Sequence, residues 1–235
     1  MPNKVLTSLY NFRLSSSSAT AIAIIFHAIG LMGILLGNQS FFAGLTAMNL
    51  LLMFFLIVFT QKQRNRFFFL FIVISFIIGL VSEIIGTNTG LLFGSYSYSS
   101  ILGLALKKVP LIIGVNWFVV VYCCGVSMQT MQDKLNAKFP EASISSKRNL
   151  KRLSLILDGA LLAVLFDWLM EPVAIKLGYW SWTGDIPFYN YCCWFLLSSL
   201  LLWLFDLLPF SKRNKFAVHL LLIQSMFFLL LRSFL

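Results

Sequence analysis

The chain has 235 residues, of which 59% are hydrophobic and 11% are charged. Because soluble domains carry about 25% charged residues, this composition excludes an ordinary soluble protein and predicts an integral membrane protein. The formal net charge of +10 does not indicate nucleic-acid binding, since the basic residues flank apolar segments, and we expect no nucleic-acid partner. No cleavable-signal pattern precedes the first apolar run, which we expect to act as its own membrane anchor.

Seven apolar segments are long enough to cross a bilayer, for which about 20 residues are needed. They cover approximately residues 19–37, 41–60, 67–86, 110–128, 152–170, 188–208 and 216–231. The fifth segment is the least regular, because Asp158 and Asp167 interrupt it. The sequence therefore predicts an all-α fold, a polytopic membrane bundle of about seven transmembrane helices that forms one domain over residues 1–235.

The basic residues are distributed unequally between the two sides of these segments. Fourteen Lys and Arg residues lie at the N-terminus and in alternate connections, and four lie on the opposite side. The positive-inside rule then places the N-terminus in the cytoplasm and the C-terminus outside. The outer connections, residues 87–109 and 171–187, are rich in glycine, serine and aromatic residues, so we expect re-entrant or interfacial segments there. The cytoplasmic connection over residues 129–151 is polar and basic and is typical of a tether.

Cysteine and histidine give no sign of a metal site. The four cysteines occur as two adjacent pairs, Cys123-Cys124 and Cys192-Cys193. Neighbouring residues of a helix point about 100° apart, so neither pair can present two ligands to one metal ion. His27 lies on the same stripe as Gly30 in the first segment, and we interpret it as a packed, hydrogen-bonded histidine and not as a catalytic base.

The stretch from Ser82 to Tyr98 combines Glu83, the one charged residue of the third apolar run, with glycine, hydroxyl groups and tyrosine. An ionisable residue inside a membrane span is costly and indicates a functional site. Irregular backbone beside it is tolerated where protein covers it or where it lines a cavity. This stretch is therefore the first candidate for a site.

Polar residues from other spans fall at the same depth as Glu83. Asp167 and Glu171 are four residues apart and share one helix face near the outer end of the fifth span. Asn116 and Asn190 lie at the outer ends of the fourth and sixth spans. We therefore predict one polar layer near the outer surface.

Two further acids are excluded from this layer. Asp158 is nine residues from Asp167 and so lies on the opposite helix face, whereas Asp206 lies at the cytoplasmic boundary. Lys176 is the one cation expected near the layer. Desolvation and like-charge proximity raise the pKa of a carboxyl group, so we expect at least one of these carboxyls to hold a proton near neutral pH. The alternative is a hydrogen-bonded network that fixes helix register.

Several spaced motifs resemble the CruF-type carotenoid biosynthesis proteins of bacteria and archaea. The first is Glu-Ile-Ile-Gly-Thr-Asn-Thr-Gly-Leu-Leu-Phe-Gly-Ser-Tyr-Ser-Tyr over residues 83–98, followed by Val-Pro-Leu at 109–111 and Asn-Trp-Phe at 116–118. The second is Asp-Trp-Leu-Met-Glu-Pro over residues 167–172, followed by Gly-Tyr-Trp-Ser-Trp at 178–182, Ile-Pro at 186–187, Asn190 and Trp-Phe at 194–195. The chain departs from the family pattern at Glu171, where Asp is expected, and at Asn88 and Leu91, where Lys and Pro are more frequent.

The resemblance implies a membrane carotenoid hydratase that adds water, without a cofactor, to the terminal double bond of an acyclic carotenoid end group. Its substrate is a lycopene-like carotenoid or a monocyclic one with an open end, and its location is the bacterial cytoplasmic membrane. Either Asp167 or Glu83 donates the proton in this hypothesis, and the other carboxyl orders the water together with Glu171. The supporting polar residues are Asn116, Asn190, Thr87 and Thr89, and the residues that line the end-group pocket are Tyr96, Tyr98, Trp117, Trp180 and Trp182.

The sequence is also compatible with two other functions. A small membrane lycopene cyclase also begins by protonating the terminal alkene, but its Pro-Glu-rich motif is not found here, since Glu171-Pro172 has the reverse order. A carotenoid-binding membrane protein would hold the pigment without turnover. A transporter is less favoured, because the spans show no internal repeat.

Overall fold

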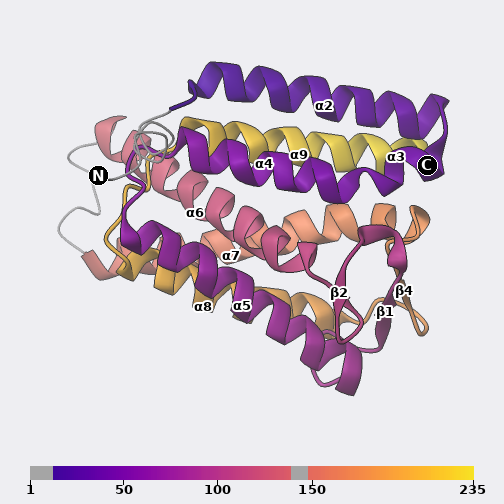
Figure 1. The fold of residues 1–235 in the computed structure, drawn as a ribbon. Helices are drawn as coiled ribbons and strands as arrows, with labels where there is room; N and C mark the ends of the chain where they lie inside the picture. The colour runs from indigo at the N-terminus through magenta and orange to yellow at the C-terminus, as the bar shows by residue number, and fades with distance from the viewer. Residues whose placement is uncertain (1–12, 139–147) are drawn as a thin grey trace, which may run out of the picture.

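A computed structural model describes residues 13–138 and 148–235 of the chain (Figure 1). The described helices are α2 (Ser16–Leu36), α3 (Gln39–Gly44), α4 (Thr46–Thr60), α5 (Arg66–Thr89), η1 (Ser100–Leu102), α6 (Ile112–Lys138), α7 (Arg148–Lys176), α8 (Phe188–Leu207) and α9 (Lys215–Phe234). Six of them, α2 and α5 to α9, are long and apolar enough to cross a membrane. The predicted all-α membrane bundle is therefore confirmed.

The region of the second predicted span contains two helices. The apolar helix α4 has 15 residues and is shorter than the other six. It is preceded by the short α3, and the single residue Leu45 separates the two. The break places Leu45 and Thr46 beside the cavity described below.

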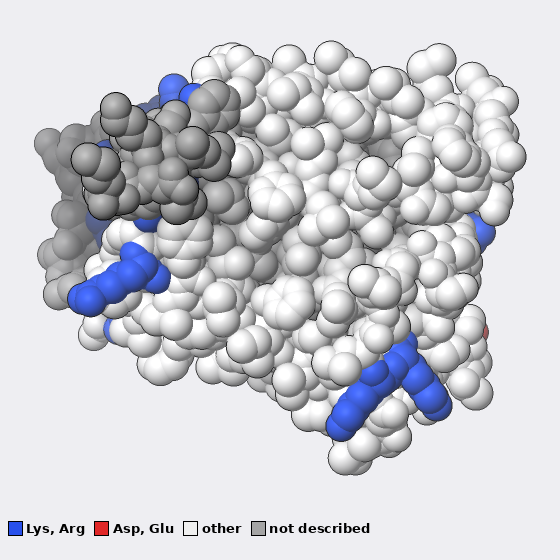
Figure 2. Space-filling model, viewed as in Figure 1, with Lys and Arg blue, Asp and Glu red and all other residues white. Residues whose placement is uncertain are grey.

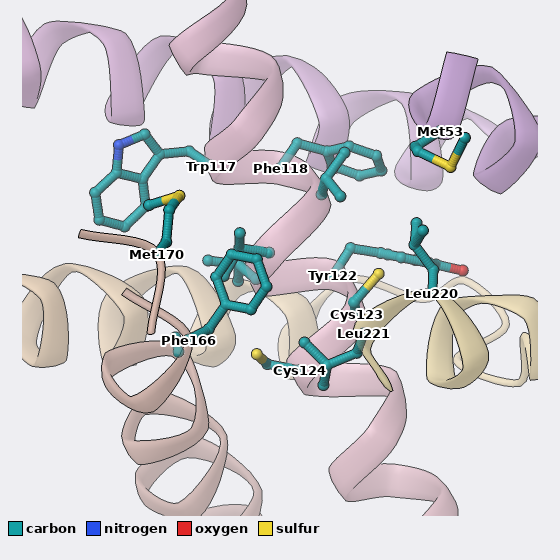
Figure 3. Close-up of a cluster of buried hydrophobic side chains, with 14 of the residues drawn as sticks. Met53, Trp117, Phe118, Tyr122, Cys123, Cys124, Phe166, Met170, Leu220 and Leu221 are labelled. Atoms are coloured by element: carbon teal, nitrogen blue, oxygen red, sulfur yellow. The ribbon is translucent and has the colours of Figure 1, made fainter. Parts of the chain in front are cut away.

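Helix α6 lies in the centre of the bundle, between α2, α4 and α9 on one side and α5 and α8 on the other (Figure 1). In its most apolar stretch 78% of the residues are buried, compared with 28–39% in the other five spanning helices. Its residues from Trp117 to Val126 are apolar or small on every face, which is the pattern of a helix surrounded by protein. Figure 3 shows these side chains packed against Met53, Phe166, Met170 and Leu220 of neighbouring helices.

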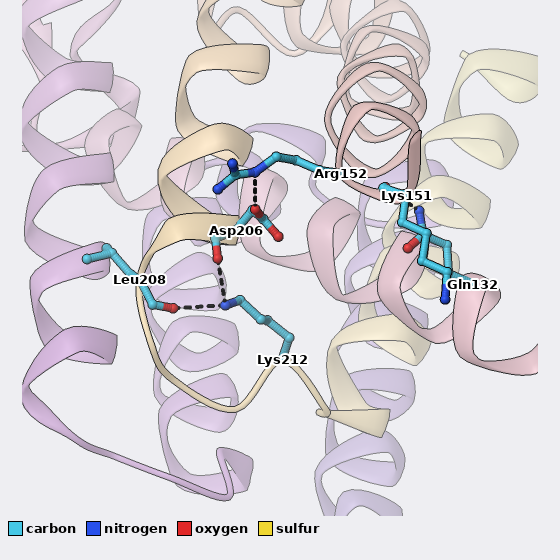
Figure 4. A network of polar contacts seen from close by, with 6 residues as sticks. All are labelled: Gln132, Lys151, Arg152, Asp206, Leu208 and Lys212. Carbon is cyan, nitrogen blue, oxygen red and sulfur yellow. Dashed lines mark hydrogen bonds and ion pairs between the residues drawn. The ribbon is translucent and has the colours of Figure 1, made fainter. Parts of the chain in front are cut away.

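Charged groups concentrate at the ends of the helices and leave the middle of the visible surface almost uncharged (Figure 2). At the end opposite the strands, Arg152 donates to Asp206 at 2.5 Å, and Lys212 donates to the carbonyls of Asp206 and Leu208 (Figure 4). Asp206 is thus held by cations at that end. The prediction of a tether over residues 129–151 is wrong for its described part, because residues 129–138 continue α6 and residues 148–151 begin α7. Residues 139–147 lie outside the described chain.

Buried hydrogen bonds join α4, α6 and α9 near the same end. The Tyr122 hydroxyl donates to Gln61 Oε1 at 2.7 Å, and the Gln61 amide donates to the Ser211 carbonyl at 2.7 Å. Asn214 Nδ2 donates to Thr60 Oγ1 at 3.1 Å. Because these groups are buried, each needs a partner, and the network fixes how the three helices meet.

At the other end the two long connections pair with each other. Strand β1 (Tyr96–Tyr98) pairs antiparallel with β4 (Trp180–Trp182), and Tyr96 lies opposite Trp182. A second pair, β2 (Ala105–Leu106) with β3 (Val109–Pro110), leads into α6. Since side chains alternate along a strand, the aromatic residues of Tyr-Ser-Tyr and Trp-Ser-Trp share one face of the first pair, and the serines are exposed on the other.

Candidate active site

Glu83 is buried near the outer end of α5 and accepts three hydrogen bonds from side chains. Its Oε2 accepts from the hydroxyl of Tyr96 and, at 2.8 Å, from that of Tyr98. Its Oε1 accepts from Trp117 Nε1 of α6 at 3.0 Å. Burial and the adjacent Glu83 raise the pKa of both tyrosines far above the usual range, so both hydroxyls remain protonated donors. Glu83 therefore connects α5, β1 and α6.

Gly79 makes the contact between Trp117 and Glu83 possible. It lies one turn before Glu83, and a Cβ atom there would come within 2.4 Å of the Trp117 ring. The indole of Trp117 also stacks on Trp194 of α8, with ring centroids 4.1 Å apart and an interplanar angle of 20°. A side chain at position 79 would displace this pair of rings and its bond to the carboxyl.

Asp167 and Glu171 lie one turn apart on α7 and are buried, as is Glu83. Glu171 Oε1 accepts from both indole N–H groups of β4, from Trp180 at 2.7 Å and from Trp182. Asp167 Oδ2 accepts from Asn190 Nδ2 of α8 at 2.9 Å. Its other oxygen, Oδ1, is buried and receives no N–H or O–H donor from the described residues. The three carboxyls thus differ in how completely they are hydrogen-bonded.

Pro172 follows Glu171 inside α7 and removes one backbone N–H from the helix. The carbonyl that this N–H would reach, four residues earlier, is that of Trp168. Arg232 in the last turn of α9 donates to this carbonyl at 2.9 Å and stacks over the Trp168 ring at 3.8 Å. Arg232 therefore replaces the missing hydrogen bond and fixes α7 where it carries the two acids.

Neutral donors surround the three carboxyls. Their partners are tyrosine, tryptophan and asparagine side chains, and no described Lys or Arg donates to them. The described ion pairs join Arg152 to Asp206 and Arg213 to Asp133, outside this layer. Within the described part of the chain, no three His, Cys, Asp or Glu side chains are grouped so that they could hold a metal ion.

Two cavities meet at this layer. A pocket of about 30 Å³ is lined by the three carboxyls, Asn190 and the aromatic side chains around them. A larger cavity of about 470 Å³ lies between α2, α4, α6, α7 and α9, and its lining is mainly apolar. Ile113, Asn116, Met170 and Trp180 line both. The larger cavity also includes the exposed side chains of Phe26, Ile29 and Met48, so it reaches the lipid-facing surface beside α2 and α4.

The structure brings most of the site residues expected from sequence to the small pocket. Its lining includes Glu83, Asp167, Glu171, Asn116, Asn190, Tyr96, Tyr98, Trp117, Trp180 and Trp182. Asn116 makes no hydrogen bond to a carboxyl among the described residues, and its place is the boundary between the two cavities. Thr87 and Thr89 donate to backbone carbonyls of α5 and do not line the described cavities.

The sequence interpretation missed four residues that line this pocket. Phe93, Ile113, Met170 and Trp194 complete its lining. Trp194 stands in the second family-like motif, and its spacing from Asn190, four residues on the same helix, was the available signal. Phe93 and Met170 also stand in the two family-like motifs, whereas Ile113 lies outside them, and all three are apolar residues that resemble lipid-facing ones in composition.

Fold and site together define an integral membrane protein with a buried acid cluster beside an apolar cavity. The family model described as "Carotenoid biosynthesis protein" matches residues 41–235, and the chain belongs to this family. No curated protein and no solved structure matches the chain. The matched range contains every residue of the small pocket, and α2 precedes it.

Proposed function

We propose that this protein is a carotenoid hydratase of the bacterial cytoplasmic membrane, which adds water across the terminal double bond of an acyclic carotenoid end group. The observation that carries the proposal is the contact between the two cavities. An apolar cavity open to lipid suits a polyene, and the adjoining pocket offers three carboxyls and, by its volume, room for a water molecule. Hydration needs these parts together: an acid, a water and a dry site for the alkene.

The hydrogen bonds that the carboxyls accept favour Asp167 as the acid. A carboxyl that protonates an alkene must direct its O–H group at the alkene. The oxygen that carries this proton should therefore not already accept hydrogen bonds from other side chains. Both oxygens of Glu83 accept hydrogen bonds, whereas Asp167 Oδ1 receives none from the described residues. Asn190 holds Asp167 through the other oxygen and so orients Oδ1. The proton therefore passes from Asp167 to the CH carbon of the terminal double bond, and the other alkene carbon, which bears the two methyl groups, becomes a tertiary carbocation.

Glu171 is placed to complete the reaction. Both indole donors are on its Oε1, which leaves Oε2 to accept a hydrogen bond from the attacking water. When the water oxygen bonds to the cation, one of its protons passes to Glu171. Asp167 and Glu171 lie one turn apart on the same face of α7, so this proton can return to Asp167. The net reaction adds one water, and the acid is regenerated without a cofactor.

The remaining groups stabilise the cation before water captures it. Glu83 supplies a carboxylate fixed by three donors, and the stacked pair of Trp117 and Trp194 supplies aromatic faces beside it. Such groups act without reorganisation because their partners already hold them in place. Cyclisation would instead require the end group to fold on itself beside the acid, and a pocket of about 30 Å³ favours a small nucleophile.

Expression in a lycopene-producing host, with mass analysis of the pigments, tests the proposal. The hydratase adds the mass of one water, which becomes heavier in isotopically labelled water, whereas a cyclase product keeps the mass of its substrate. We expect Asp167→Asn to abolish the hydrated product with normal protein levels in the membrane. Asp158→Asn, an exposed carboxyl on the same helix, is the matched control and should leave the product unchanged. Unchanged products in Asp167→Asn, Glu83→Gln and Glu171→Gln would favour a carotenoid-binding protein without turnover.

A further inference from the structure

The apolar cavity contains a polar pair that the proposed reaction does not use. His27 of α2 and Gln224 of α9 both line it, and their side chains are 6% and 8% exposed. Gln224 makes no hydrogen bond to any described residue. Polar side chains buried inside a membrane bundle without a partner are costly, which indicates that a ligand supplies the partner.

His27 is held so that one of its nitrogens is available. Its Nδ1 bonds the carbonyl of Ala23 at 2.7 Å, and its ring packs edge-on against Phe227 with centroids 5.3 Å apart. A backbone carbonyl accepts, so Nδ1 carries the proton and the neutral ring presents Nε2 as an acceptor. Gln224 adds amide N–H donors from the neighbouring helix. An acceptor and a donor together match a hydroxyl group, which can donate to one and accept from the other.

The pair lies across the cavity from the carboxyls. Helices α2 and α9 lie on one side of α6, and α5, which carries Glu83, lies on the other (Figure 1). The boundary with the acid pocket is made by α6, α7 and β4, through Asn116, Met170 and Trp180. A polyene whose end group reaches the acids therefore places a more distant part of its chain beside His27 and Gln224.

We propose that His27 and Gln224 form a second binding subsite that recognises a hydroxyl group on the carotenoid, remote from the open end group that reacts. The inference rests on the carotenoid ligand of the proposed function and not on its hydration step. A hydrocarbon carotenoid that fills the cavity leaves His27 Nε2 and the Gln224 amide without a partner, whereas a hydroxylated one can bond to both. The subsite thus selects among carotenoids that share the same reactive end.

Binding measurements test this without turnover. Bound polyenes quench tryptophan fluorescence, and the chain has six tryptophans, four of which line the acid pocket. The probes are a hydrocarbon carotenoid with one open end group and the same carotenoid bearing one hydroxyl or one keto group at its other end. We expect the full-length protein in lipid nanodiscs to bind the hydroxylated probe about tenfold more tightly than the hydrocarbon. The keto group can accept a hydrogen bond but cannot donate one, so the affinity for the keto probe should lie between the affinities for the other two probes.

Substitutions assign the preference to the pair. Gln224→Leu and His27→Phe should each reduce the preference for the hydroxylated probe and keep or improve hydrocarbon binding. His27→Gln retains an acceptor and should keep part of the preference. The matched control is Leu52→Val, which changes an apolar lining residue of the same cavity and should leave the preference unchanged. Equal affinities of the wild-type protein for all probes, tighter binding of the keto probe, or an unchanged preference in both variants would overturn the inference. If the preference is found but no pigment is hydrated, the subsite stands and the proposed reaction fails.

Discussion

Replacing Glu83 by glutamine keeps the shape of the side chain and removes its charge, which tests whether this carboxyl organises the site. Three donors from two other elements, Tyr96, Tyr98 and Trp117, point at it. The glutamine oxygen can still accept from Trp117, but its amide nitrogen then faces two hydroxyl donors. An amide nitrogen cannot accept, so both tyrosine hydroxyls must turn away or turn round to accept from it. The variant therefore replaces charge-assisted hydrogen bonds by neutral ones.

The expected change in the free energy of unfolding follows from the number of hydrogen bonds that Glu83 accepts. A hydrogen bond to a charged group contributes about 1.5–3 kcal/mol and a neutral one about 0.5–1.5 kcal/mol. Converting three such bonds lowers the free energy of unfolding by about 3 kcal/mol, and removing the desolvation cost of a buried charge offsets part of this loss. We expect a net destabilisation of about 2 kcal/mol, which lowers the midpoint of thermal unfolding by about 4–8 °C in a chain of this size.

Thermal unfolding in detergent, followed with a thiol-reactive fluorophore, measures this change. Cys123, Cys124 and Cys193 are buried in the folded protein and become reactive when it unfolds. The control is Asp158→Asn, which neutralises an exposed carboxyl and should shift the free energy of unfolding by less than about 0.5 kcal/mol. If Glu83→Gln unfolds at the same temperature as the control, or at a higher one, the role of Glu83 as the centre of this network is refuted.

Three further changes probe the parts that position the site. Arg232→Leu leaves an α7 carbonyl unpaired and should destabilise the protein by about 2 kcal/mol, and Arg232→Lys by less, in the same unfolding assay. Gly79→Ala displaces Trp117 and should abolish hydrated pigment at normal protein levels. At Gly44, which lines neither cavity, a Cβ meets no atom within 4 Å, and Gly44→Ala should retain the product. Tyr122→Phe leaves a buried amide oxygen unpaired and should cost about 1–2 kcal/mol of unfolding free energy.

The sequence predicted what depends on depth in the membrane. Apolar run lengths gave the bundle, and the alternation of basic connections gave a direction to each span. Direction alone placed Glu83, Asp167 and Glu171 at one level, and the structure brings them to one pocket. Depth is predictable because it is a one-dimensional quantity that the span boundaries and the positive-inside rule determine.

The rotation of each helix about its own axis and the pairing of distant strands could not be predicted in the same way. The strands β1 and β4 have three residues each and lie more than 80 residues apart, so neither has the length that a periodic signal needs. They were expected as interfacial segments, and the alternation in Tyr-Ser-Tyr and Trp-Ser-Trp was the one local sign of extended structure. The position of Gln224 in the cavity was not predicted, because a single polar residue in a span does not reveal which neighbouring helix it faces.

The paired strands explain how three acids of one layer acquire different roles. Strand β1 supplies both tyrosine hydroxyls to Glu83 on α5, and β4 supplies both indole N–H groups to Glu171 on α7. The register of one short sheet therefore sets the relative positions of two carboxyls on different helices. Asp167 receives nothing from the sheet, and its Oδ1 has no N–H or O–H donor among the residues that the structure describes. A hydrocarbon end group has no polar atom with which it could orient an acid, so the protein itself must fix the positions of the carboxyls. It does so by distributing its hydrogen-bond donors unequally among the three carboxyls.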